Sequence, residues 1–220
     1  MQTHLIEVQQ TARYYVLGED LAQPSDVWLC LHGYGLIGER FAPKFEPWVA
    51  KGARVIAPEG FQRFYLMDDW NKVGCNWMTR DLREHDIVNI NTYLSRVLDI
   101  ATQDLIPNSY RLHVLGFSQG APVAWRFVNF THHKVQTLVL YAGTFPDEPL
   151  RPWQLQDLKI LLPMGDSDQY LIPERMAAHA ELVAKQGLQI ENIPFRGGHV
   201  ILPEVLDQVW EKACGPLVTP

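Results

Sequence analysis

The sequence predicts an α/β protein built on a mostly parallel, eight-stranded sheet with helices on both faces. Two observations support this prediction. Short, continuously apolar runs recur along the chain, as expected for strands that are covered on both faces. Stretches with apolar residues at helical spacing separate most of these runs, and such alternation is typical of a parallel sheet. The 220 residues suit one domain spanning 1–220.

Eight segments carry the strand pattern. The first two, 4–8 and 13–17, are separated by a polar stretch and predict a hairpin. Residues 27–31, VWLCL, are apolar throughout and predict a strand buried on both faces. Similar runs occupy 53–57, 112–116, 137–141 and 159–164, with a weaker one at 188–193.

Helical periodicity is clearest from residue 81 to 101, where apolar residues fall three and four apart. Two further helices, 173–187 and 203–213, begin at proline, a favoured first helical residue. Residues 118–130 also have a helical pattern. The apolar stretch 36–51 contains two prolines, so any helix there is short or broken.

Charge and cysteine content exclude several classes of protein. The chain has 25 acidic and 19 basic residues, a net charge of −6 that argues against nucleic acid as the main partner. No apolar stretch approaches the roughly 20 residues of a membrane span. The three cysteines have neither disulfide-framework nor zinc-site spacing. With no signal-peptide pattern at the start, we expect a cytoplasmic location.

The stretch LGFSQGAP, residues 115–122, holds a serine between two glycines. It follows a predicted strand and opens a predicted helix, which is the context of a G-x-S-x-G nucleophile elbow. Gly116 and Gly120 allow the tight packing of such a turn. We therefore predict that Ser118 is a nucleophile at the carboxyl edge of the sheet.

A nucleophilic serine needs a base, usually a histidine oriented by a carboxylate, and in this architecture the chain order is serine, acid, histidine. His199 follows the last predicted strand and two glycines, so we predict that it is the base. Asp166 and Asp168 follow the seventh predicted strand. We favour Asp168, because Asp166 comes directly after a glycine and suits a turn role. Asp147 and Glu148 are the minority alternative.

The tetrahedral intermediate of acyl transfer requires hydrogen-bond donors for its oxyanion. One predicted donor is the backbone N–H of Gln119, directly after the nucleophile. The second should come from the glycine-rich loop HGYGLIG after the 27–31 strand. We predict the N–H of Tyr34, with Gly33 or Gly35 as alternatives.

Residues 58–80 have neither strand nor helical period but contain several aromatic residues. Their apolar surface must pack on something, because its exposure costs about 25 cal/mol per Å². We predict that this segment forms one wall of the substrate pocket, with ordinary core packing as the alternative. The predicted wall residues are Phe64, Tyr65, Trp70, Trp77 and Met78.

These motifs together resemble the phospholipase/carboxylesterase family of α/β-hydrolases, which includes acyl-protein thioesterases. The resemblance spans LHGYG (31–35), APEG (57–60), LGFSQGA (115–121), GDSDQYLIP (165–173) and GGH (197–199). It implies Ser118, Asp168 and His199 as the catalytic triad and the amides of Tyr34 and Gln119 as oxyanion donors. The segment 63–86 is similar to that of a bacterial esterase-type branch.

We therefore expect a serine carboxylesterase that hydrolyses esters of short to medium acyl chains through an acyl-serine, without metal or cofactor. The stretch 142–159 is too short for a large lid domain. The expected partner is a small-molecule ester, and a homodimer is compatible with the sequence. Alternatives are an acyl thioesterase or lysophospholipase with the same triad, or a non-catalytic binding protein of this fold.

Overall fold

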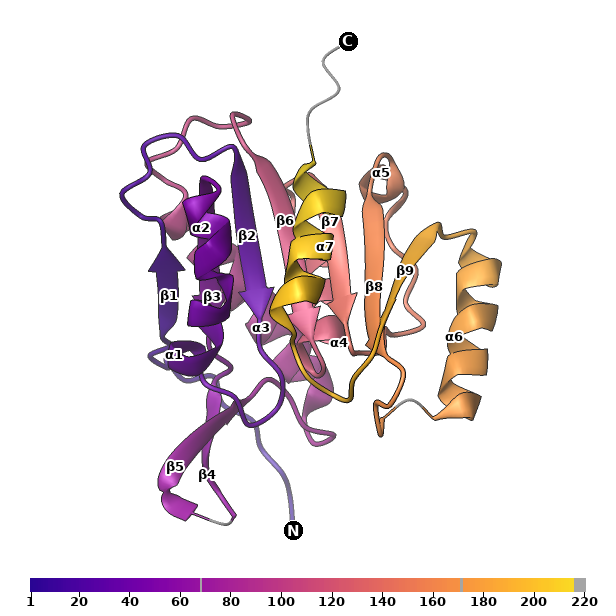
Figure 1. Ribbon diagram of the computed structural model, residues 1–220. Coiled ribbons are helices and arrows are strands. Elements are labelled where there is room, and N and C mark those ends of the chain that lie inside the picture. The colour runs from indigo at the N-terminus through magenta and orange to yellow at the C-terminus, as the bar shows by residue number, and fades with distance from the viewer. Residues whose placement is uncertain (68, 171, 216–220) are drawn as a thin grey trace.

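The computed structural model describes residues 1–67, 69–170 and 172–215. Its centre is a seven-stranded sheet in the order β1-β3-β2-β6-β7-β8-β9 (Figure 1). Strand β1 is antiparallel to β3, and the other neighbouring pairs are parallel. The strands are β1 (Tyr14–Leu17), β2 (Asp26–Leu31), β3 (Ala53–Pro58), β6 (Arg111–Phe117), β7 (Val135–Tyr141), β8 (Lys159–Gly165) and β9 (Ile190–Phe195).

Helices cover both faces of the sheet (Figure 1). One face packs against α3 (Arg83–Ala101) and α4 (Gly120–Phe130). The other packs against α1 (Gly38–Phe41), the 3-10 helix η1 (Ala42–Phe45), α2 (Glu46–Ala50) and α7 (Pro203–Cys214). Two further helices are α5 (Pro152–Leu155) and α6 (Pro173–Gln186). The double cover explains why every residue of β2 is buried.

The predicted mostly parallel sheet with helices on both faces is confirmed, but among the described residues the sheet has seven strands and not eight. The predicted strand 4–8 is not a strand, and its apolar side chains are exposed. Strand β1 pairs with β3, so the predicted hairpin with residues 4–8 does not form. An alternating pattern indicates a strand only where a neighbouring strand is present to pair with it.

The segment 58–80 contains a two-stranded antiparallel hairpin, β4 (Gln62–Leu66) and β5 (Asp69–Asn76). It projects from the edge of the molecule at which the parallel strands end (Figure 1). The sequence of this segment shows no alternating strand pattern because aromatic side chains occupy both faces of β4. The register between β4 and β5 also shifts between Tyr65 and Leu66. The stretch 36–51 is broken into α1, η1 and α2, as its prolines predict.

The carboxyl ends of β2, β6, β7 and β8 meet at one edge of the sheet (Figure 1). The loops after these strands contain the glycine-rich stretch, Ser118 and the aspartates predicted from the sequence. Open α/β sheets bind ligands at this edge. Within the described ranges, no helix has the length and apolar character needed to cross a membrane.

Candidate active site

Ser118 lies in a strained turn between β6 and α4, with a backbone φ of +54°. The turn needs glycine on each side, because the chain doubles back on itself. A Cβ on Gly116 would lie 2.1 Å from the carbonyl oxygen of Gly120, and a Cβ on Gly120 would lie 2.3 Å from that of Leu31. The N–H of Ser118 donates to the carbonyl of Tyr141 at 2.9 Å, which ties the turn to the end of β7. The serine hydroxyl is thereby presented at the carboxyl edge.

The structure brings Ser118, His199 and Asp168 into one hydrogen-bonded line. Nε2 of His199 lies 2.7 Å from Oγ of Ser118, and Nδ1 lies 2.7 Å from Oδ2 of Asp168. Asp168 is buried, and its Oδ1 accepts the N–H of Tyr170 at 2.9 Å. Because an ionised carboxylate only accepts, the imidazole proton lies on Nδ1, and unprotonated Nε2 accepts the hydrogen bond of the Ser118 hydroxyl.

Asp166 has a different environment, although it is only two residues away. Its Oδ1 accepts the N–H of Gly197 at 3.1 Å and the hydroxyl of Ser167 at 2.8 Å. These hydrogen bonds, that of Gly197 first, hold the pKa of Asp166 below its ordinary value. Asp166 therefore ties together the two loops that carry Asp168 and His199. Of the minority candidates, Glu148 forms an ion pair with Arg126.

The predicted oxyanion donors flank Ser118. A Cβ on Gly33 would lie 3.2 Å from Cβ of Ser118, so the glycine-rich loop passes directly beside the serine. Among the hydrogen bonds of the described residues, the N–H groups of Tyr34 and Gln119 have no protein acceptor. The N–H of Gly35, one of the alternatives, donates to the carbonyl of Cys75 at 2.9 Å. Tyr34 and Gln119 thus have amides available for a ligand.

His32 anchors the start of this loop from within the core. Its Nε2 accepts the N–H of Gly60 at 2.9 Å, so Nδ1 carries the proton and donates to the carbonyl of Gly33 at 2.7 Å. Burial lowers the pKa of His32 to about 4. Trp77 stacks on the imidazole at 4.8 Å and donates its Nε1 hydrogen to the His32 carbonyl. His32 is therefore neutral at pH 7, with both ring nitrogens engaged.

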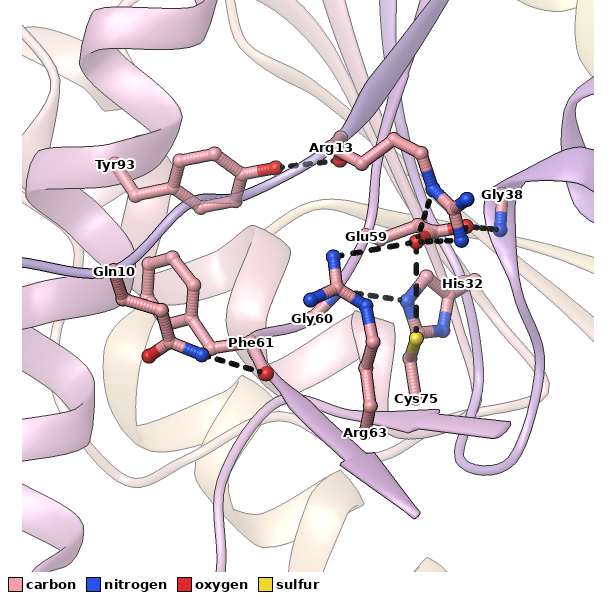
Figure 2. Close-up of polar contacts among 10 residues, drawn as sticks. All are labelled: Gln10, Arg13, His32, Gly38, Glu59, Gly60, Phe61, Arg63, Cys75 and Tyr93. Carbon is pink, nitrogen blue, oxygen red and sulfur yellow. Dashed lines mark hydrogen bonds and ion pairs between the residues drawn. The ribbon is translucent and has the colours of Figure 1, made fainter. Parts of the chain in front are cut away.

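Glu59 anchors the end of the loop, and sequence reasoning assigned it no role. Figure 2 shows its fully buried carboxylate between the guanidinium groups of Arg13 and Arg63. Oε1 accepts the N–H of Gly38 at 2.8 Å, and Arg13 lies 2.9 Å from Oε2. The thiol of Cys75 lies 3.9 Å from Oε2, and its burial, followed by the nearby Glu59 charge, raises its pKa to about 11. The APEG motif at 57–60, which contains Glu59, was the sequence feature that could have pointed to this residue.

A cavity of about 180 Å³ opens beside Ser118. Its wall is formed by residues that follow β6, β7, β8 and β9, together with the end of β8 itself. Besides Ser118, Asp168 and His199, the lining residues are Gln119, Pro122, Ala142, Gly143, Thr144, Met164 and Tyr170.

None of the five predicted wall residues lines this cavity. Trp77 is fully buried in the core, and Met78 packs against it. Phe64 stacks on the ring of Tyr34 at a centroid distance of 5.0 Å. Tyr65 and Trp70 are exposed on the hairpin and contact each other. The rings of Phe64, Tyr65 and Trp70 thus lie on the hairpin and not in the cavity wall, which periodicity could not indicate.

Two side-chain clusters in the described part of the chain have metal-ligand chemistry. One is Asp26, His113 and Cys214, and the other is Asp99, His132 and His133. In the first cluster, the Asp26 carboxylate is also paired with Arg111 at 2.7 Å. Neither cluster contains a residue of the Ser118 site.

A serine held in a nucleophile elbow at the end of a parallel strand, beside a histidine, is typical of serine hydrolases with the α/β-hydrolase fold. The family model described as Serine hydrolase (FSH1) matches residues 23–209, and the chain belongs to this family. The protein is therefore a serine hydrolase, in agreement with the resemblance drawn from its motifs. Among proteins with curated descriptions, none matches the chain.

Solved structures of esterases and thioesterases share the fold. A carboxylesterase from Mesorhizobium loti superposes with a TM-score of 0.71 at 19% identity, covering 96% of this chain and 99% of its own. Acyl-protein thioesterase 2 from Zea mays gives 0.69 at 18% identity, covering 94% of this chain and 100% of its own. The Bacillus cereus carboxylesterase gives 0.66 at 18% identity, with coverages of 92% and 94%.

Proposed function

We propose that the protein hydrolyses carboxylic esters of short to medium acyl chains through an acyl-serine intermediate. The observation that carries this proposal is the pair of 2.7 Å contacts that join Ser118, His199 and Asp168. In the proposed roles, Ser118 is the nucleophile, His199 the general base and acid, and Asp168 the group that orients His199.

In the proposed reaction, Oγ of Ser118 attacks the ester carbonyl as its proton passes to Nε2 of His199. The carbonyl oxygen becomes an oxyanion, which accepts hydrogen bonds from the backbone N–H groups of Tyr34 and Gln119. The tetrahedral intermediate then breaks its bond to the alcohol oxygen, and His199 returns the proton to the departing alcohol. Water, deprotonated by His199, then attacks the acyl-serine; the bond between the acyl carbon and Oγ breaks, His199 returns the proton to Oγ of Ser118, and the carboxylic acid is released.

The size of the cavity supports a short acyl group. Its volume of about 180 Å³ is close to the roughly 150 Å³ of an apolar cavity that holds benzene. An acyl chain of about six carbons therefore fills the cavity. Pro122, Ala142 and Met164 supply apolar surface to its wall.

The test is a series of p-nitrophenyl esters from acetate to palmitate, assayed for kcat/KM. We expect the value to rise from acetate to about hexanoate and to fall for longer chains, since each added CH₂ within the cavity gains about 0.8 kcal/mol. A maximum at palmitate, or no burst of p-nitrophenol from an acyl-enzyme, would contradict the proposal.

Thioester hydrolysis is the second candidate, because the Zea mays protein of the same fold is an acyl-protein thioesterase. The same triad and oxyanion donors serve both leaving groups. An ester and a thioester with the same short acyl group separate the two reactions. If kcat/KM for the thioester is greater by more than tenfold, thioesterase becomes the better assignment; lysophospholipid hydrolysis is tested in parallel.

A further inference from the structure

Three side-chain amides form a hydrogen-bonded chain from helix α3 to the residue after Ser118. Gln62 of β4 donates from Nε2 to Oδ2 of Asp86 at 3.0 Å. Asn76 of β5 donates from Nδ2 to Oε1 of Gln62 at 2.5 Å. Gln119 donates from Nε2 to Oδ1 of Asn76, also at 2.5 Å. These four residues, named here the amide relay, link the β4–β5 hairpin to the nucleophile elbow.

All hydrogen bonds of the amide relay donate in the same direction, toward Asp86, and the Asp86 carboxylate sets this direction. Asp86 only accepts when ionised, so Gln62 must turn its NH₂ group toward Asp86 and its oxygen toward Asn76. Asn76, buried between two glutamines, must then donate to Gln62 and accept from Gln119. Each amide is thereby oriented by its neighbour, and the chain polarises toward the charge.

The side chain of Gln119 is held at both of its polar atoms. Oε1 accepts the backbone N–H of Trp77 at 3.2 Å, and Nε2 donates to the carbonyl of Met78 at 3.2 Å as well as to Asn76. The same residue presents its free backbone N–H beside Ser118. Side-chain anchoring therefore restricts the residue that carries one of the proposed oxyanion donors.

We propose that the amide relay positions the Gln119 N–H for the oxyanion, with Gln62, Asn76 and Asp86 as positioning residues. This inference rests on the proposed function. Loss of one oxyanion donor costs about 10²–10³ in kcat. A donor that is displaced but still present costs less in kcat than a lost one. A displacement of about 1 Å lowers the rate by up to 10²-fold. The relay therefore acts on the transition state and leaves substrate binding unchanged.

The test removes one hydrogen bond of the amide relay, that from Gln62 to Asp86, at a distance from Ser118. Gln62→Glu places two carboxylates face to face and removes the donor to Asp86. The new carboxylate at position 62 then turns away and leaves Asn76 without its acceptor. We expect kcat to fall about tenfold with KM unchanged.

The double variant Gln62→Glu with Asp86→Asn restores the relay, since the new amide donates to the new carboxylate, which accepts from Asn76 as before. We expect kcat to return to within about twofold of the wild type. Gln10→Glu is the matched control, because Gln10 donates to the carbonyl of Phe61 beside the hairpin but does not contact the relay. This control should leave kcat unchanged.

Unchanged kcat in Gln62→Glu overturns the inference, as does a loss of kcat that the double variant does not restore. A merely structural role also overturns it, and would appear as a lower melting temperature with kcat per folded molecule unchanged. Failure of the proposed function is a separate result, namely turnover that persists in Ser118→Ala.

Discussion

Nε2 of His199 lies 2.7 Å from Oγ of Ser118, although 81 positions separate the two residues in the chain. The contact is possible because β6 and β9 both end at the same edge of the sheet, with Ser118 directly after β6 and His199 in the loop after β9. The ring of His199 also packs at 5.1 Å from that of Phe117, the last residue of β6. The base is therefore held by packing as well as by hydrogen bonds.

Ser118→Ala is expected to abolish ester turnover while the fold is kept, because the hydroxyl makes no contact that the core requires. An organophosphonate should label the wild type at Ser118 and leave the variant unlabelled, as read by mass spectrometry of peptides. Labelling at another residue in the variant would place the nucleophile elsewhere.

Asp168→Asn is expected to lower kcat by about 10³–10⁴, by analogy with the triad aspartate of serine proteases. An amide at this position favours the wrong tautomer of His199. Asp166→Asn should cost less than tenfold, because its amide oxygen can still accept the N–H of Gly197. Steady-state kinetics of both variants decide between the two aspartates, and the opposite ranking would show that Asp166 is the functional acid.

The stability of the fold should fall in acid because of His32. Its pKa is lowered from 6.5 to about 4, so protonation favours the unfolded chain. The contribution is fully present above pH 6.5 and is lost as the pH falls toward 4, on the order of 3 kcal/mol. Urea unfolding at several pH values measures this loss.

His32→Gln supplies the comparison, because its amide oxygen can accept the N–H of Gly60 and does not titrate. The variant should have a shallower dependence of unfolding free energy on pH between 4 and 6.5. Burial also lowers the pKa of His113, but that residue is present in both proteins and cancels in the difference. Identical pH slopes would exclude His32 as the titrating group.

Trp77→Ala is expected to destabilise the protein by about 3–5 kcal/mol, as for other buried tryptophans. It removes the stacking on His32 and the hydrogen bond to the His32 carbonyl. Trp70→Ala should change the free energy of unfolding by less than about 0.5 kcal/mol, because the side chain is 77% exposed. Denaturant unfolding of both variants tests this, and equal effects would contradict the assignment of Trp77 to the core.

Met164→Ala is expected to move the preferred acyl chain to a greater length, because Met164 lines the cavity beside Ser118. The kcat/KM maximum for p-nitrophenyl esters should shift by about two to three CH₂ groups, and activity on acetate should fall with lost contact. Tyr65→Ala, on the exposed hairpin, is the control and should leave the preference unchanged. If both variants shift the preference, the hairpin also contacts the acyl chain.

The sequence by itself determined those features that depend on local chemistry. The apolar run before Ser118 and the flanking glycines define a strand–turn–helix. This reading is local, because a Cβ at position 116 or 120 would clash with the backbone of such a turn. The continuous apolar character of β2 likewise indicates a strand covered on both faces. From these features came the parallel sheet, the serine hydrolase family and the order of candidate residues along the chain.

Only the tertiary structure decided which groups meet at the sheet edge. Asp166 and Asp168 have the same chemistry, and the path of the loop alone directs Asp168 to His199 and Asp166 to Gly197. Trp77 and Trp70 both belong to one aromatic segment, yet Trp70 is exposed on the hairpin, whereas Trp77, directly after it, is buried in the core. Residue type and periodicity report the burial of one element, whereas a pocket wall or the amide relay depends on contacts between elements that are distant in the chain.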